Sequence, residues 1–126
     1  LELVSALAPT EGVAGNNDAP ELVERLGLRR VVAIAGVRIG LTHGHLGPGR
    51  TSRDRAMGSF AGEAALDAIV FGHSHVPLVE RQPDGQWVVN PGSPTDRRRQ
   101  PRCTWALMTI EAGRVAAVEL VGFDRR

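Results

Sequence analysis

The sequence predicts an α/β sandwich with a mixed sheet. Helix-compatible stretches occur in the first part of the chain, and short apolar runs of strand length lie between and after them. Segments with alternating or apolar patterns, joined by hairpin-type turns, fill the last third. This distribution favours helices packed on a sheet. The 126 residues contain no internal repeat and no linker, so residues 1–126 are predicted to form a single domain.

The first expected elements are short. Residues 1–7 make an apolar segment that resembles the middle of an element, and residues 12–15 predict a short buried strand ending in a glycine turn. Pro20 suits the first turn of a helix that runs to about Leu26, because proline is favoured at the first helical position. Asp18 is the expected N-cap of this helix.

The later elements are marked by β-branched runs and by turns. Two runs, 30–35 and 37–42, are separated by Gly36 and predict two strands joined by a tight turn. Asp-Gly at 84–85 and Ala-Gly at 112–113 indicate two further hairpin turns. The remaining expectations, in order, are a loop over 46–51, a helix over 52–66, a buried strand over 67–71, and strands over 78–81, 86–90, 104–110 and 114–121.

Composition excludes several classes of protein. All 15 basic residues are arginine and the net charge is only +1, which favours neither a membrane partner nor a stable nucleic-acid complex. The longest apolar runs are far shorter than the ~20 residues of a membrane helix. The single cysteine, Cys103, lies in an apolar run and is expected to be a buried, inert thiol. A lone cysteine is compatible with the reducing cytoplasm, which is the expected location.

The four histidines provide the strongest functional signal. They form two His-X-His pairs, His43 with His45 and His73 with His75, and each pair closely follows an apolar run of strand length. Neutral imidazole binds divalent transition metals well, and strand ends hold ligands rigidly. Gly-Asn-Asn-Asp at 15–18 adds polar side chains at a third predicted strand end. The pattern predicts a metal site. A zinc finger is excluded because there is one cysteine, and a serine hydrolase because no Gly-X-Ser-X-Gly occurs.

Four motifs together resemble the calcineurin-like metallophosphoesterases, in particular the small bacterial and archaeal phosphodiesterase branch. They occur in the order and spacing of that family: Gly-Asn-Asn-Asp at 15–18, Thr-His-Gly-His at 42–45, Gly-His-Ser-His at 72–75 and Asn-Pro-Gly-Ser at 90–93. The resemblance covers nearly the whole chain. It implies that the fold is a portion of a four-layer αββα sandwich with mixed sheets.

The resemblance also implies a dinuclear metal centre. Asn16, His43 and His73 would bind one ion, and His75 would bind the other. Two divalent ions are expected, with Mn²⁺ favoured and Fe, Ni or Zn as alternatives. The family's Asp-X-His and Gly-Asp-X-X-Asp motifs, which supply further ligands, do not occur in this sequence. We expect that the chain lacks the amino-terminal part of the domain; a natural short form without catalysis is the alternative.

Asn17 and His45 are the candidate catalytic residues near the leaving group. Many relatives carry a histidine directly after the ligand asparagine, where this chain has Asn17. An amide cannot act as a general acid, so protonation would have to come from water, the metals or another residue such as His45. The alternative role for His45 is structural support that orients His43 or a loop carbonyl.

Arginines near the motifs are candidates for binding substrate phosphate. Arg50 lies in the Gly/Pro loop, and Arg97 begins the run 97–99 after Asn-Pro-Gly-Ser. Guanidinium groups bind phosphate through two parallel hydrogen bonds. The alternative for the run is a solvated loop, and the Asn-Pro-Gly-Ser turn is expected to shape the site without doing chemistry.

The expected function is a metal-dependent phosphodiesterase that hydrolyses small phosphodiesters or nucleotides. In such a centre two ions bind phosphate oxygens and lower the pKa of a bridging water, which attacks phosphorus in line. The resemblance leaves two alternatives open. The same family includes the retromer subunit, which serves mainly as an interaction protein, and a metal-binding module without catalysis is the other. A homo-oligomer is expected, because a partial domain leaves core surface uncovered.

Overall fold

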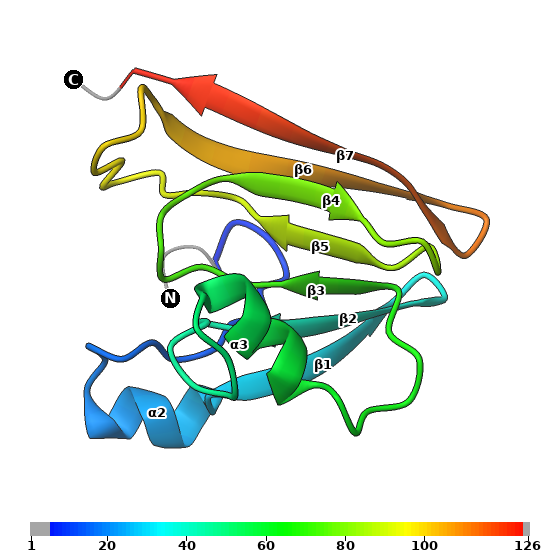
Figure 1. Cartoon of the computed structure of the whole chain (residues 1–126), viewed down its shortest axis with the longest axis horizontal. Helices are drawn as coiled ribbons and strands as arrows, with labels where there is room; N and C mark the ends of the chain where they lie inside the picture. The colour runs from blue at the N-terminus through cyan, green and yellow to red at the C-terminus, as the bar shows by residue number, and fades with distance from the viewer. Residues whose placement is uncertain (1–5, 125–126) are drawn as a thin grey trace.

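The architecture, seen in a computed structural model that describes residues 6–124, combines a five-stranded mixed sheet with a two-stranded ribbon (Figure 1). The sheet has the strand order β1-β2-β3-β5-β4, and the ribbon consists of β6 and β7. The elements are α2 (Pro20–Leu26), β1 (Arg29–Ile34), β2 (Val37–Thr42), α3 (Ser52–Ser59), β3 (Ala68–Val70), β4 (Leu78–Arg81), β5 (Trp87–Asn90), β6 (Cys103–Glu111) and β7 (Arg114–Phe123).

Three hairpins lie where the turn signals predict them. β1 pairs antiparallel with β2, β4 with β5, and β6 with β7. Gly36, Gly85 and Gly113 have φ angles of 84°, 93° and 73°. Glycine adopts this left-handed region without steric cost, so each of these positions lets the chain reverse direction tightly.

The sheet separates two apolar clusters, and this produces three layers. On one face Ile69 and Val88 pack with Ala56 and Phe60 of the α3 region. On the other face Ala68 belongs to a second cluster, against which side chains of the β6–β7 ribbon pack. The side chains of neighbouring residues in one strand therefore point to opposite faces of the sheet, as the two-residue period of a strand requires. The α3–sheet–ribbon arrangement confirms the predicted portion of an αββα sandwich.

Two predictions near the start of the described chain are wrong. Residues 12–15 form no strand; Ala14 is buried, but its N–H donates to the carbonyl of Gly27 at 2.7 Å and not to a neighbouring strand. The N-cap of α2 is Ala19, because the Asp18 carboxylate instead accepts a hydrogen bond from the N–H of Gly15 at 2.6 Å. Most of the apolar segment 1–7 lies outside the described residues.

The helix predicted over 52–66 ends at Ser59. Gly58 lies so close to Pro48 that an added Cβ would come within 2.6 Å of the proline ring. The chain then turns so that Phe60 and Leu66 both enter the cluster beneath α3. Packing of these two side chains overrides the helix propensity of the alanines between them. Cys103 is 1% exposed, as expected, and no helix within residues 6–124 is long and apolar enough to cross a membrane.

Candidate metal centre

The carboxyl ends of three parallel strands bring the histidine motifs together. β3 lies between β2 and β5 and is parallel to both, so the three strands end at one edge of the sheet (Figure 1). His43 directly follows β2, and His73 lies three residues after β3. The N–H of Gly72 donates to the carbonyl of His43 at 2.9 Å, which joins the two loops.

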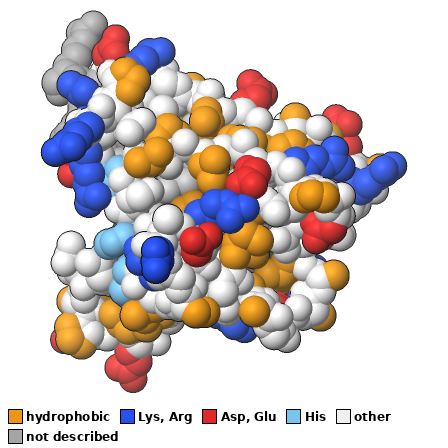
Figure 2. Space-filling model, viewed as in Figure 1, with side chains coloured by type: hydrophobic (Ala, Val, Ile, Leu, Met, Phe, Trp, Pro, Cys, Tyr) orange, Lys and Arg blue, Asp and Glu red, His pale blue; other side chains and the backbone are white. Residues whose placement is uncertain are grey.

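Three of the four imidazoles gather at this edge. The ring centroids of His43 and His73 are 5.0 Å apart, those of His43 and His45 are 5.1 Å apart, and those of His45 and His73 are 6.3 Å apart. Figure 2 shows histidine side chains grouped at the left edge of the molecule, with arginine side chains beside them. His43 and His45 share a hydrogen bond between their Nδ1 atoms at 3.0 Å. The bond places His45 against His43, and the role of His45 stays a prediction.

The second histidine loop has an unusual backbone. His73 and His75 have φ angles of 69° and 60°, in the left-handed region that non-glycine residues seldom adopt. Such conformations persist only where the surroundings impose them, and they concentrate at functional sites. The ring of His75 forms a hydrogen bond through Nδ1 with the carbonyl oxygen of Asp96 at 2.5 Å.

Asn90, the last residue of β5, holds that loop in place. Its side chain is fully buried, and its amide nitrogen donates to the carbonyl of Gly72 at 3.3 Å and to the hydroxyl of Ser74 at 3.1 Å. Its amide oxygen accepts from the N–H of Gly92 at 2.9 Å. Asn90 therefore fixes both sides of His73, which is the shaping role predicted for the Asn-Pro-Gly-Ser turn.

The amino-terminal motif lies against the same cluster. A Cβ added to Gly15 would come within 3.1 Å of the His43 ring, so glycine allows this loop to approach the imidazole closely. Asn16 and Asn17 are exposed, next to Gly15. The Asp18 carboxylate is close enough to His43 to favour the protonated ring, an effect smaller than the effects of burial and of the neighbouring histidines, which lower the pKa of His43.

The net electrostatic environment keeps two of the rings neutral. Burial lowers the pKa of His43 below the usual value for histidine. The adjacent rings of His73 and His45 disfavour a further positive charge beside them, which lowers this pKa more and outweighs Asp18. Burial also lowers the pKa of His73, followed by the positive charge of Arg55. Both rings are consequently neutral at pH 7, the state in which imidazole can bind a metal.

Arg55 is a site residue that the sequence motifs missed. Its guanidinium donates to the carbonyl of Gly44 at 3.1 Å, and its charge acts on His73. Position 55 lies on α3, outside every motif, so nothing in the sequence marked it. The guanidinium of Arg97 instead donates a hydrogen bond to the carbonyl of Gln100 at 2.6 Å. Arg50 is exposed, and its backbone carbonyl accepts a hydrogen bond from the guanidinium of Arg55. Phosphate binding by Arg50 and Arg97 stays a prediction.

The donor set is suited to a transition metal but is not complete. His43 and His73 offer neutral imidazoles at one place, and the amide of Asn16 belongs to the adjoining loop. Within residues 6–124, however, no group of three or more His, Cys, Asp or Glu side chains is arranged to hold a metal ion. The carboxylate motifs that the family resemblance implies do not occur in the sequence. Further ligands would therefore be needed to close the coordination sphere.

Comparison with known proteins establishes the family. Residues 1–113 match the model of the calcineurin-like phosphoesterase superfamily domain. The chain therefore belongs to the calcineurin-like phosphoesterase superfamily. No curated protein matches the sequence significantly.

Several solved structures are similar to this chain in fold. A Thermotoga maritima protein solved by NMR is 28% identical with a TM-score of 0.61; the match covers 90% of this chain and only 65% of that protein. Vps29 from Entamoeba histolytica, complexed with Zn²⁺, is 22% identical with a TM-score of 0.73 and coverages of 98% and 73%. A novel archaeal phosphodiesterase is 20% identical with a TM-score of 0.62 and coverages of 88% and 67%. The last two show likeness of fold alone.

Proposed function

We propose that the chain contributes a divalent-metal site to a phosphodiesterase that hydrolyses small phosphodiesters or nucleotides. The convergence of His43, His45 and His73 at one sheet edge, with ring centroids 5.0 to 6.3 Å apart, carries this proposal. Membership of the phosphoesterase superfamily and the likeness to an archaeal phosphodiesterase support it. When bound, divalent metal supplies charge stabilisation and a nucleophilic hydroxide. Mn²⁺ is the favoured ion, with Fe, Ni and Zn as alternatives.

Different residues of the chain would bind the metal ions, attract the substrate and transfer a proton. His43, His73 and Asn16 would hold one ion and His75 the other. Arg55 acts electrostatically on His73 and contributes positive charge that attracts a phosphate anion. Asn17 cannot transfer a proton to the leaving group. His45 could, because within residues 6–124 its only hydrogen bond is through Nδ1, which leaves Nε2 able to exchange a proton.

Hydrolysis of a chromogenic phosphodiester in the presence of Mn²⁺ tests this function. We expect turnover that depends on metal and that disappears in His73→Ala, while the surface variant Arg30→Gln keeps full activity. Thermal unfolding of each variant checks that the fold survives. Equal activity in His73→Ala and the unchanged protein would contradict the proposal.

An interaction function is the alternative that a separate observation favours. Trp105 and Leu107 project from one face of β6 and are 43% and 47% exposed, and the half-buried Val121 of β7 pairs with Trp105 on the same face. Large apolar side chains gathered on a surface mark contact sites. We propose a second copy of the chain as the partner. Light scattering after size exclusion would then show a dimer that Leu107→Asp dissociates; a monomer at every concentration would contradict this.

A further inference from the structure

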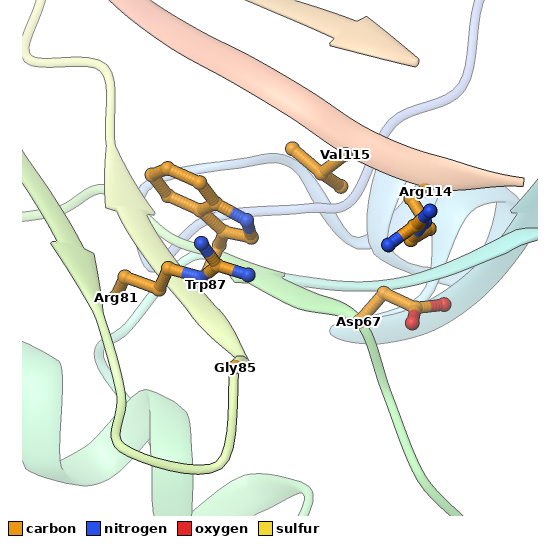
Figure 3. Close-up of a pocket in the computed structure, with 6 residues that line it drawn as sticks. All are labelled: Asp67, Arg81, Gly85, Trp87, Arg114 and Val115. Atoms are coloured by element: carbon orange, nitrogen blue, oxygen red, sulfur yellow. The ribbon is translucent and has the colours of Figure 1, made fainter. Parts of the chain in front are cut away.

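A small pocket opens at the end of the sheet opposite to the histidines. It is lined by the residues at the start of β3 and β5, the end of β4 and the start of β7, and its volume is about 110 Å³. Since β3 and β5 are parallel and lead to the histidine cluster with their carboxyl ends, this pocket lies at their amino ends. Its lining residues are Asp67, Arg81, Gly85, Trp87, Arg114 and Val115 (Figure 3).

Two guanidinium groups line this pocket without an anionic partner. Across residues 6–124 no carboxylate forms an ion pair with Arg81 or Arg114. Arg81 instead lies over the ring of Trp87, with its Cζ atom 5.4 Å from the ring centroid. The lining residues carry two positive charges, on Arg81 and Arg114, and one negative charge, on Asp67, so an anion that contacts both guanidinium groups would be attracted.

The walls of the pocket are held in position. The Trp87 side chain packs against the cluster between sheet and ribbon, and the backbone N–H of Trp87 donates to the backbone carbonyl of Asp67 at 2.9 Å. The carboxylate of Asp67 accepts a hydrogen bond from the N–H of Arg38 at 2.8 Å. Gly85 has a φ of 93°, and an added Cβ would lie 4.0 Å from the Arg81 guanidinium. The indole ring and Asp67 are thus placed by the fold, whereas the charged ends of the arginines can adjust to a ligand.

We propose that this pocket is a binding site for a small phosphate-bearing anion. Guanidinium groups present paired N–H donors that match phosphate oxygens. Asp67 adds a requirement, because an ionised carboxylate only accepts hydrogen bonds. The ligand must therefore carry anionic oxygens for Arg81 and Arg114 and an O–H group for Asp67. Monohydrogen phosphate meets this requirement, as does a phosphomonoester with a free hydroxyl, whereas sulfate has no donor.

The location separates this site from the histidine cluster and from catalysis. Arg81 covers one face of Trp87 and the core packs against the indole, which leaves no free face for a stacked nucleobase. The pocket itself holds about 110 Å³, room for a compact anion, and a second hollow shares its residues Arg81, Arg114 and Val115. Inorganic phosphate and a compact phosphomonoester such as glycerol phosphate are the two sources of this chemistry.

Fluorescence of Trp87 tests the proposal directly. In a Trp105→Phe background Trp87 is the only tryptophan. With EDTA present and ionic strength fixed, we expect inorganic phosphate to change its emission saturably below about 10 mM. Arg114→Gln should weaken binding about tenfold, because a charged hydrogen-bond partner is lost, while Arg30→Gln leaves the Kd unchanged. Absence of a saturable change in emission, or the same Kd in Arg114→Gln as in the unchanged pocket, would overturn the proposal that this pocket binds phosphate.

Competing anions test the role of Asp67 and the identity of the ligand. Sulfate should bind more weakly than phosphate to the unchanged pocket, and Asp67→Asn should remove this preference because an amide can donate to sulfate. Equal binding of the two anions before substitution would overturn the recognition of a ligand O–H group. Tighter binding of glycerol phosphate than of phosphate assigns the site to a phosphomonoester, and the reverse order assigns it to free phosphate.

Discussion

Replacing Asn90 with alanine tests how the histidine loop is held. The substitution removes two hydrogen bonds donated to Gly72 and Ser74 and one accepted from Gly92, all from a side chain that is fully buried. At ~1 kcal/mol for each bond, the free energy of unfolding should fall by about 3 kcal/mol. At ~4 °C per kcal/mol, the melting temperature should fall by about 12 °C.

Urea denaturation of four proteins provides the measurement. The four are the unchanged chain, Asn90→Ala, Ser74→Ala and the double variant. If the bond between these two side chains acts as described, the double-variant cycle gives a coupling of about 1 kcal/mol. Loss of loop support should also weaken metal binding, by ~10-fold or more. A loss of stability below about 0.5 kcal/mol in Asn90→Ala would refute the reasoning.

Three further outcomes follow from the same geometry. Gly40→Ala should cost about 1–3 kcal/mol in urea unfolding, because the new Cβ would lie 3.0 Å from two core side chains, whereas Gly62→Ala, which has open space, should be neutral. Gly15→Ala should weaken metal binding in calorimetry, since its Cβ would press on the ring of His43 at 3.1 Å; unchanged affinity would contradict this contact. The pKa values of His43 and His73 are lowered in the fold, so the metal-free protein should lose stability as pH falls through the unfolded histidine pKa of about 6.5; a flat profile between about pH 7 and 5 would contradict this.

Local turn chemistry explains why most strands could be predicted. The β1–β2, β4–β5 and β6–β7 hairpins each turn at a glycine with positive φ, and the flanking runs have strand composition. These signals lie within a few residues of the structure they specify. The helix end at Ser59 could not be predicted, because it accompanies the burial of Phe60 and Leu66 in a cluster that includes Val88, a residue far along the chain.

Some residues of the candidate site could likewise be found from the sequence, and others could not. His43 and His73 could be found because glycines and strand-like runs surround them, and the parallel pairing of β2 with β3 then brings their rings together. Arg55 could not, because an arginine on a polar helix has no distinguishing neighbours in the sequence. Asp18 shows the limit of a local rule: the same residue type suits an N-cap and a loop, and the bond to Gly15 decides between them.

The number of metal ions retained per chain tests the central claim most directly. The measurement is elemental analysis after loading with Mn²⁺ and desalting, on the unchanged protein and on His73→Gln. The account predicts at least one ion per chain in the first and loss of that ion in the second, with melting curves showing that both are folded. Absence of retained metal in the unchanged protein, or equal retention in His73→Gln, would contradict a metal centre built on these histidines.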